Sequence, residues 1–498
     1  MAVASTKKVA SKGLIKTLEI KTNCSYQTED GKFIDKILDG IANVSVETSE
    51  KVGDFLQFVG KVCLTSIFVD NEKQLGSEKI ESNFSEKVQI GDADATVIIP
   101  KVVSVKQRRE TSNYVDCSII LSVEIYGVLQ ESIAYVDSGN VGLVEKTKEI
   151  EAESLLCFNN SAFNINDEIE SVDHIDKIIA SYTNFTINKV VPNGNYVTVD
   201  GELNRDVLYV SDGITKKLQK RNDFTQELAL LNCNDETIIS SHIYLSDDSL
   251  SFGLSDDGTK SVITCNANIS VSVWGFERIK FNCLDDVYST NKELEIKHST
   301  FSNIIQYNSA FGSENLLVNI DMSDKKRIDE IVSIGSNSVL INSVVVEKSV
   351  CKIGGVITQK IIAKNYDNDD IFSMEIEVPY STQININVEE NAECNPCVVA
   401  KCVNAKNKAG KELSLTYEIN IMSDISQKKL ESYISECNEL TDKALSKHSI
   451  VIYMPEKTEK IFEIAKKLSV TPEVILAQNP GISDNEPIEK VTLFKCMK

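Results

Sequence analysis

Apolar and polar residues alternate with a period of two through most of the chain. The segments 122–127 (SVEIYG), 195–210 (NYVTVDGELNRDVLYV) and 261–275 (SVITCNANISVSVWG) show this alternation, are rich in Val, Ile, Thr and Tyr, and end at or near Gly, Asp or Asn. A period of two places the apolar residues on one face of a β-strand. Strands with one apolar and one polar face are typical of antiparallel sheets. The pattern therefore predicts a mainly β protein.

Three short marks recur in the same order along the chain. The first has the apolar spacing of a short helix and occurs at 34–38, 175–179 and 328–332. The second is a glycine and the third is an aromatic residue, in the pairs Gly60 and Phe84, Gly201 and Phe224, and Gly355 and Tyr380. The first mark precedes the glycine by 26, 26 and 27 residues, and the glycine precedes the aromatic residue by 24, 23 and 25. Two spacings that vary so little indicate three related copies.

The copies are predicted to be tandem domains that span 1–150, 151–298 and 299–423. Each is too long for a solenoid repeat of about 20–45 residues. We expect each copy to be a small β-sandwich or barrel with one short helix. The recurring glycines and aromatic residues are interpreted as bulge or turn positions and core anchors, and not as ligand-binding residues.

The pattern changes after Met422. Between 424 and 448 the apolar residues Leu430, Tyr433, Ile434, Cys437 and Leu440 have helical spacing, which predicts a helical linker. Residues 449–498 then read as strand, helix, helix and strand, a small α+β module. Thr458 and Thr471 are the expected N-caps of its two helices, and Asn479-Pro480-Gly481 ends the second one.

The C-terminal module resembles a LysM domain. Ile464-Ala465-Lys466-Lys467, Leu468, Val470 and Asn479-Pro480-Gly481 stand where that family has its helix signature and its Asn-Pro turn. The resemblance implies two binding loops, formed by Thr458, Glu459, Lys460, Ile461 and Phe462, and by Asn479, Pro480 and Gly481. The family's Gly-Asp-Thr-Leu-Trp motif is replaced here by residues 458–462, which removes the glycine that allows close approach of a sugar amide. A protein partner is therefore favoured over an N-acetylglucosamine glycan.

The three copies resemble the SPOCS domain, a domain associated with the spore coat. Residues 199–203 (VDGEL), 207–210 (VLYV) and 223–225 (DFT) carry the resemblance best, and the third copy carries it least. Tandem SPOCS domains followed by one LysM domain are similar to a clostridial family of spore morphogenetic proteins. This implies a scaffold made in the mother-cell cytoplasm and then found on the forespore surface or spore coat. Its LysM domain would bind a morphogenetic protein, the coat-basement ATPase. The alternative is a peptidoglycan-binding attachment protein.

The acidic composition limits the classes of partner. The chain has 74 Asp and Glu against 52 Lys and Arg, and its net charge is -22. Such a charge repels phosphate backbones and argues against nucleic-acid binding. No stretch approaches the ~18 apolar residues of a membrane-spanning helix, so we expect no membrane insertion. The lysines in the first twenty residues leave no apolar core for a signal peptide. The 13 dispersed Cys are then read as reduced core thiols.

No catalytic motif stands out, so we predict a protein that is not an enzyme and that needs no cofactor. Cys394, Cys397 and Cys402 have a spacing that offers three zinc ligands, but neither a nearby His nor a second CxxC completes the set. They are weak metal candidates, and reduced thiols on a strand are the favoured interpretation. A hydrolase with paired carboxylates stays open at this stage.

Overall fold

The structure is a computed structural model of the 498-residue chain. It describes residues 4–28, 33–255, 260–323, 325–368, 370–386, 392–408, 411–443, 450–456, 458–483, 488 and 490–494. Among these residues the protein is mainly β, as the alternating pattern predicts. Within the same ranges no helix combines the length and the apolar character needed to cross a bilayer.

Eighteen strands form three units of six. The first unit contains β1 (Ala4–Gln27), β2 (Ile34–Val52), β3 (Phe55–Asp70), β4 (Leu75–Gln89), β5 (Asp94–Arg109) and β6 (Tyr114–Val136). The second contains β7 (Leu143–Ser171), β8 (Lys177–Asn193), β9 (Tyr196–Ser211), β10 (Ile214–Ala229), β11 (Ile238–Leu254) and β12 (Ser261–Ser289). The third contains β13 (Lys292–Asp321), β14 (Ile328–Glu347), β15 (Val350–Asn365), β16 (Ile371–Asn385), β17 (Glu393–Lys408) and β18 (Glu412–Asp442).

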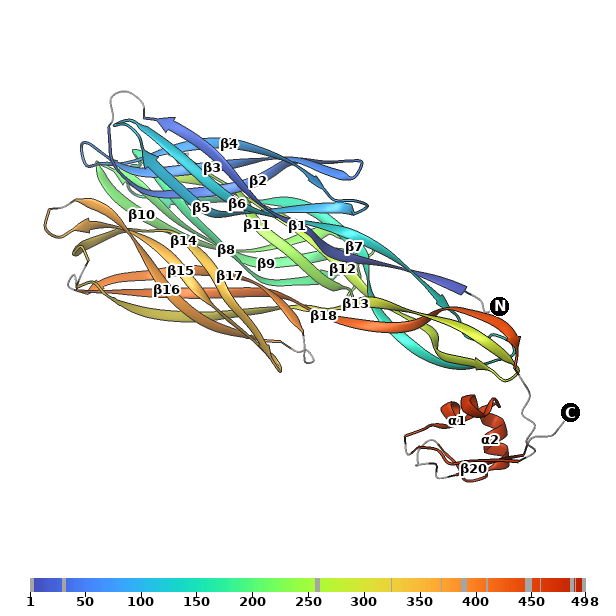
Figure 1. Cartoon of the computed structure of the whole chain (residues 1–498). Coiled ribbons are helices and arrows are strands. Elements are labelled where there is room, and N and C mark those ends of the chain that lie inside the picture. The colour runs from blue at the N-terminus through green and yellow to red at the C-terminus, as the bar shows by residue number, and fades with distance from the viewer. Residues whose placement is uncertain are drawn as a thin grey trace.

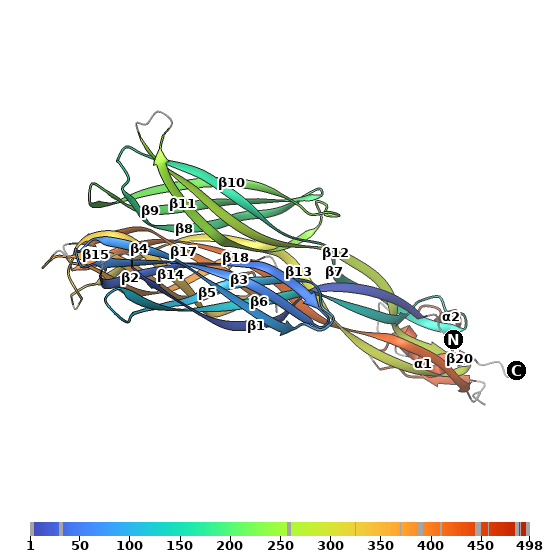
Figure 2. The same ribbon diagram turned by 90° about the horizontal axis from the view of Figure 1, so that it is seen from above.

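The same topology occurs in all three units. In the first unit one sheet has the order β1-β6-β5 and the other has the order β2-β3-β4. The second unit repeats this arrangement with the sheets β7-β12-β11 and β8-β9-β10. The third unit repeats it with the sheets β13-β18-β17 and β14-β15-β16. Each pair of antiparallel sheets encloses its own hydrophobic cluster, so we call the units the first, second and third sandwich. Figure 1 shows the first sandwich above the third, and Figure 2 shows the second beside them.

The recurring glycines and aromatic residues are structural partners. Gly60, Gly201 and Gly355 lie in the central strands β3, β9 and β15, directly opposite Phe84, Phe224 and Tyr380 of the next strand. On the other side of each glycine the neighbouring strand has a β-bulge, at Val46/Thr48, Ile187/Lys189 and Ile341/Ser343. The interpretation as bulge positions and core anchors is confirmed. The bulge and the aromatic ring leave no room for a side chain on the glycine.

Gly201→Ala is expected to lower the free energy of unfolding by about 1–3 kcal/mol because it overpacks the sheet. A Cβ atom at this position would lie 2.5 Å from the carbonyl oxygen of Thr186 and 2.9 Å from Cε1 of Phe224. Gly253→Ala is the matched control, because a Cβ atom at Gly253 has no neighbour within 4 Å. Urea denaturation of both variants checks the prediction, and equal stabilities would contradict it.

The predicted short helices are wrong. Residues 34–38 and 328–332 lie in β2 and β14, and residues 175–179 lead into β8. Each segment contains bulges next to the apolar residues, for example at Ile34/Lys36 and Ile37/Asp39. A bulge adds one residue and shifts the alternation by one position, so residues three apart, such as Ile34 and Ile37, face the same side. The resulting spacing imitates that of a helix.

The predicted helical linker at 424–448 is also wrong. β18 continues without interruption to Asp442, and residues 444–449 lie outside the described residues. A bulge at Ser435 again produces the helical spacing, since His298 pairs with Ile434 and Lys297 with Glu436. Leu430 and Leu440, expected on the buried face, are exposed. The strands also place the unit limits near 137–142 and 290–291, because β7 begins at Leu143 and β13 at Lys292.

Three long strand pairs leave the sandwiches together and form a stalk. It consists of residues 4–11 with 129–136, 143–154 with 277–289, and 292–305 with 427–442. Its core combines buried residues of all three sandwiches: Val9 and Ile133 of the first, Ile150, Ala152, Phe281 and Cys283 of the second, and Phe301 and Tyr433 of the third. The three sandwiches therefore form one body, and the expectation of separate tandem domains misses this packing.

A hydrophobic cluster joins the three sandwiches at the end away from the stalk. It contains Leu38 of the first sandwich, Ile179 of the second and, at its edge, Val332 of the third, which all belong to the first recurring mark. Asp39, which follows Leu38 in β2, is 1% exposed. Its carboxylate accepts a hydrogen bond from the Tyr182 hydroxyl of the second sandwich (3.3 Å). It also accepts hydrogen bonds from the backbone amide and the hydroxyl of Ser336 in the third sandwich (2.7 and 2.6 Å). The recurring mark thus forms the contact between the units.

A second buried network lies near the start of the stalk. The Lys12 ammonium of the first sandwich donates to Ser240 Oγ (2.8 Å) and to His242 Nε2 (2.9 Å) of the second, and lies 3.5 Å from Asp424 Oδ2 of the third. It also lies 4.2 Å from the ring centroid of Trp274, a cation–π contact. Burial and the neighbouring Lys12 lower the pKa of His242 to about 3, which keeps this ring neutral, so that Nε2 can accept a hydrogen bond from Lys12.

The C-terminal module has the predicted order of strand, helix, helix and strand. It consists of β19 (Ile450–Tyr453), α1 (Ile461–Leu468), α2 (Pro472–Gln478) and β20 (Val491–Phe494), and the two strands are antiparallel. The apolar face of α1, formed by Ile461, Ile464, Ala465 and Leu468, is buried. Thr471 is the N-cap of α2, as predicted, but Lys460 and not Thr458 occupies this position in α1.

Candidate interaction surface on the C-terminal module

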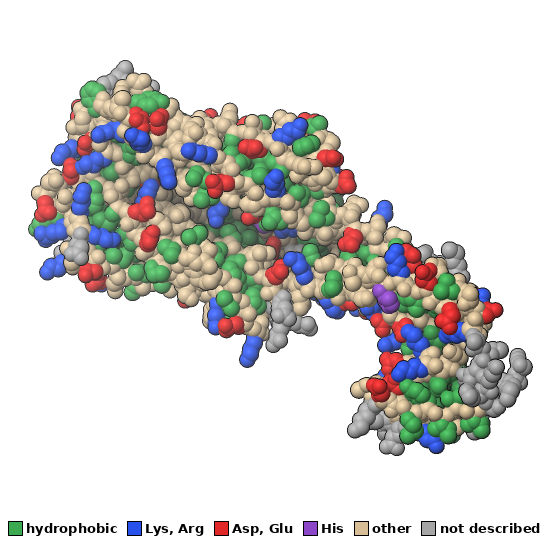
Figure 3. Space-filling model, in the orientation of Figure 1, with side chains coloured by type: hydrophobic (Ala, Val, Ile, Leu, Met, Phe, Trp, Pro, Cys, Tyr) green, Lys and Arg blue, Asp and Glu red, His purple; other side chains and the backbone are tan. Residues whose placement is uncertain are grey.

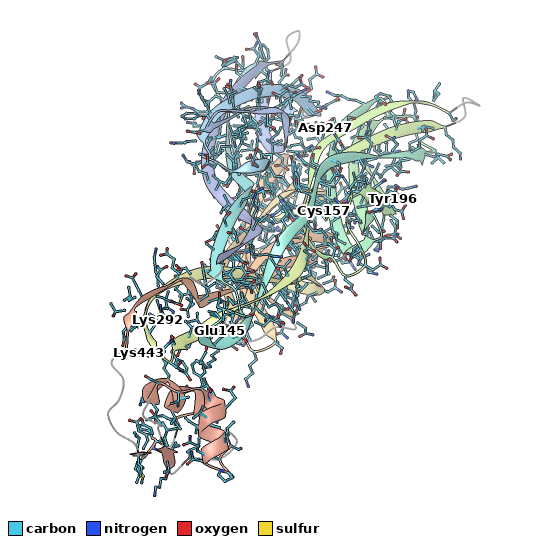
Figure 4. The ribbon with its side chains drawn as sticks, turned by 90° about the vertical axis from the view of Figure 1, so that its right-hand side faces the viewer. Glu145, Cys157, Tyr196, Asp247, Lys292 and Lys443 are labelled. Atoms are coloured by element: carbon cyan, nitrogen blue, oxygen red, sulfur yellow. The ribbon has the colours of Figure 1, made fainter. Side chains whose placement is uncertain are left out.

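The C-terminal module is attached to the stalk by the end of β12. Tyr288 packs among the residues of the module's core, donates a hydrogen bond to the carbonyl oxygen of Val470 (2.7 Å), and meets Phe462 edge to face at 5.3 Å. Lys466 Nζ lies 2.6 Å from a carboxylate oxygen of Asp286. Figure 4 shows Lys292, Lys443 and Glu145 at the same end of the stalk, which faces the module. These contacts give the module a defined orientation.

The first predicted binding loop is only partly accessible. Ile461 is 6% exposed and belongs to the module's core, and Phe462 packs against Tyr288. The Glu459 carboxylate accepts a hydrogen bond from Tyr453 (2.9 Å) and pairs with Lys467, and this pairing lowers the pKa of Glu459. Thr458 and Lys460 are exposed. Three of the five predicted loop residues therefore support the module internally or contact the stalk.

The second predicted loop is organised by Asn479. Its carboxamide donates to the carbonyl oxygens of Ile475 (2.9 Å) and Thr492 (2.8 Å) and accepts from the Thr492 amide (2.8 Å). Asn479 thus fastens the end of α2 to β20, because its side chain pairs with the strand backbone as another strand would. Pro480 and Gly481 follow on the surface, and Gly481 has a φ of +99°, which favours glycine.

An apolar surface on β19 was missed by the sequence analysis. Ile450, Ile452 and Met454 are 57%, 59% and 68% exposed, whereas the alternate residues Val451 and Tyr453 pack against the module's core. We call these three residues the β19 stripe. Figure 1 shows the sheet on the side of the helices away from the stalk, and Figure 3 shows hydrophobic side chains gathered along that lower edge.

The sequence does contain a signal for this surface. Residues 450–454 (IVIYM) are apolar at every position, and such a run is typical of a strand covered on both faces. Among the residues that the structure describes, only the helices cover the sheet, on one face. The β19 stripe therefore has the composition of a buried face without a covering element among the described residues.

The three candidate metal-ligating cysteines do not converge. Cys394 and Cys402 point to the buried face of β17, and Cys397 lies exposed on the opposite face. Residues three apart in a strand face opposite sides, so the CxxC spacing cannot bring both thiols to one ion here. Burial raises the pKa of the Cys394 and Cys402 thiols, in the second case to about 11, which disfavours the thiolate form that binds metals.

Comparison with known proteins assigns no relative. The candidate surface consists of Thr458, Lys460, Pro480 and Gly481 from the predicted loops and the residues of the β19 stripe, all of which are exposed. The candidate surface is defined by this geometry alone, since no family model, no curated protein and no solved structure matches the chain.

Proposed function

We propose that the protein is a non-catalytic scaffold of spore-coat assembly, similar to the clostridial morphogenetic protein SipL. In this proposal residues 449–498 are a LysM domain that binds a coat morphogenetic protein, by resemblance the coat-basement ATPase. The sandwiches are SPOCS domains that contact other coat components. The protein acts first in the mother cell and then on the forespore surface. The observation that carries the proposal is the uncovered β19 stripe.

The exposed residues and the attachment of the module support a role in protein binding. Apolar residues exposed next to each other on one face are typical of protein–protein interfaces. The attachment through Tyr288 and Asp286 holds the helices against the stalk, while the β19 stripe stays exposed. The peptidoglycan alternative depends on the loop 458–462, where Ile461 is buried and Phe462 contacts Tyr288. The geometry therefore favours a protein partner over a glycan.

Ile452→Asp is expected to weaken recruitment of the full-length protein to the forespore surface at least about tenfold, because a carboxylate would be buried in an apolar interface. Leu317→Asp is the matched control, since Leu317 is an equally exposed apolar residue (64%) on β13, far from the module in the chain. Fluorescent fusions in a sporulating clostridial host measure recruitment, and thermal melting of both purified variants checks their folding.

Normal recruitment of a folded Ile452→Asp variant would contradict the proposal. A pull-down with purified peptidoglycan decides on the alternative. Retention of the wild-type protein that N-acetylglucosamine oligomers compete away would favour the glycan-binding function, and a lack of retention would exclude it.

A further inference from the structure

A large groove separates parts of the second and third sandwiches. It has a volume of about 1090 Å³. The second sandwich contributes the end of β8, the turn before β11, and Glu277 and Arg278 of β12. The third contributes residues 309–311 of β13 and the end of β16.

One wall of the groove contains a strand edge that no strand of the described residues pairs with. β11 begins at Ile238, which pairs with Phe276 of β12. β12 continues to Ser289 but pairs from Glu277 onward with β7 alone among the described residues. The edge that β11 covers elsewhere is therefore open at Glu277 and Arg278. An open edge presents backbone N–H and C=O groups in the arrangement that another extended chain needs for pairing.

The side chains around this edge suit an extended polypeptide. Val190, Val191 and Phe311 provide apolar contacts, while Lys189, Asp235, Glu236 and Arg278 provide charges of both signs. A strand added to a sheet gains affinity from its backbone and specificity from alternate side chains. One set of its side chains would enter the apolar part of the groove, and the other set would face the charged residues or water.

The groove is fixed in shape before any ligand binds. Asp424 of β18 accepts hydrogen bonds from Ser240 of the second sandwich (2.6 Å) and from Ser309 of the third (2.7 Å). Ser309 lines the groove, and its hydroxyl also lies 3.5 Å from the carbonyl oxygen of Ile239 in the opposite wall. Because hydrogen bonds join the two walls, their conformational entropy is lost when the protein folds and not when a ligand binds.

We propose that this groove binds an extended segment of another polypeptide with alternating apolar and polar residues. The segment continues the position of β11 and pairs with the free edge of β12 from Glu277 onward. This site is separate from the β19 stripe, so the protein would hold two partners at once.

The proposal is tested with random 12-residue peptides displayed on phage and selected on the full-length protein. We expect enrichment of peptides that alternate apolar and polar residues. Ala310→Trp fills the groove and should weaken their binding at least about tenfold. Asn315→Trp is the matched control, because Asn315 is exposed on the same strand outside the groove. Equal binding to both variants, or no enrichment above background, would overturn the proposal.

Two further measurements address the pairing itself and use the unaltered protein. N-methylation of every second peptide bond should abolish binding in one phase and be tolerated in the other, since a strand at a sheet edge pairs through alternate residues. Tolerance of both phases would exclude strand addition. Amide exchange at 277–281 should slow when a selected peptide is added, and unchanged exchange there would place the peptide elsewhere.

Discussion

Replacing Asp39 by alanine is expected to destabilise the protein by about 3–5 kcal/mol, the usual cost of removing one partner of a buried ion pair. The Asp39 carboxylate joins all three sandwiches. It accepts hydrogen bonds from Tyr182 and Ser336 and lies 3.2 Å from the Lys360 ammonium. Its removal leaves two backbone amides, two hydroxyl groups and an ammonium group without this acceptor. The contact between the units should therefore weaken more than the core of any one unit.

Guanidinium denaturation followed by circular dichroism and by tyrosine fluorescence measures this effect. We expect the transition of Asp39→Ala to begin at lower denaturant and to separate into more than one step, because the sandwiches have separate cores. Asp35→Ala in the same strand is the control. Asp35 is exposed and its loss should change the stability by no more than about 0.5 kcal/mol. A single unshifted transition for Asp39→Ala would show that the carboxylate does not hold the sandwiches together.

The local features of the fold were predictable from the sequence. The alternation in segments such as 195–210 depends only on which residues face the core, and this segment forms β9 and the turn before it. The spacing from Gly201 to Phe224 was also informative, because a hairpin brings residues at a fixed separation opposite each other. The same argument applies to the helical face of α1, where burial repeats every three to four residues.

The errors have one physical cause. Bulges at Ile34/Lys36, Ile37/Asp39 and Ser435 change the phase of a strand, and a sequence pattern cannot distinguish such a phase shift from a helical period. The effect of the bulges is visible only in the packing of the units, because they turn Leu38 and Tyr433 toward the other sandwiches. The association of the three units also escaped prediction, because it depends on contacts between residues hundreds of positions apart.

The candidate surface was predictable in part. The sequence indicated the right module and the loop residues that remain exposed, such as Lys460 and Pro480. It could not show that Tyr288, far away in the chain, covers Phe462. Nor could it show which face of β19 lacks a cover, because Ile450 to Met454 are apolar in both phases.

Asp424, at the start of the segment 424–448, has a central role in the structure. It is the only acidic partner within 4 Å of the Lys12 ammonium among the described residues, and both side chains are mostly buried, at 11% and 16% exposed. Burial lowers the pKa of Lys12, and the Asp424 carboxylate opposes that effect. The same carboxylate accepts hydrogen bonds from Ser240 and Ser309, on the two sides of the groove. One residue therefore connects the stability of the three-unit body with the shape of a binding site.

Asp424→Asn should destabilise the protein by about 3–5 kcal/mol near neutral pH, because it leaves the buried Lys12 ammonium without its counter-charge. The double variant Lys12→Met/Asp424→Asn removes both charges and should recover part of this loss, which a double-mutant cycle in urea measures.

The loss of stability in Asp424→Asn should also depend on pH. The Lys12 pKa lies below 10.5 in the folded protein and falls further without Asp424, so the unfolded chain binds more protons in the window below 10.5. Stability then rises with pH in that window, and it rises earlier for the variant. The deficit should shrink as the pH is raised from about 7 toward about 10. A constant deficit, or a double variant less stable than Asp424→Asn, would show that the Lys12 charge does not determine the stability of this junction.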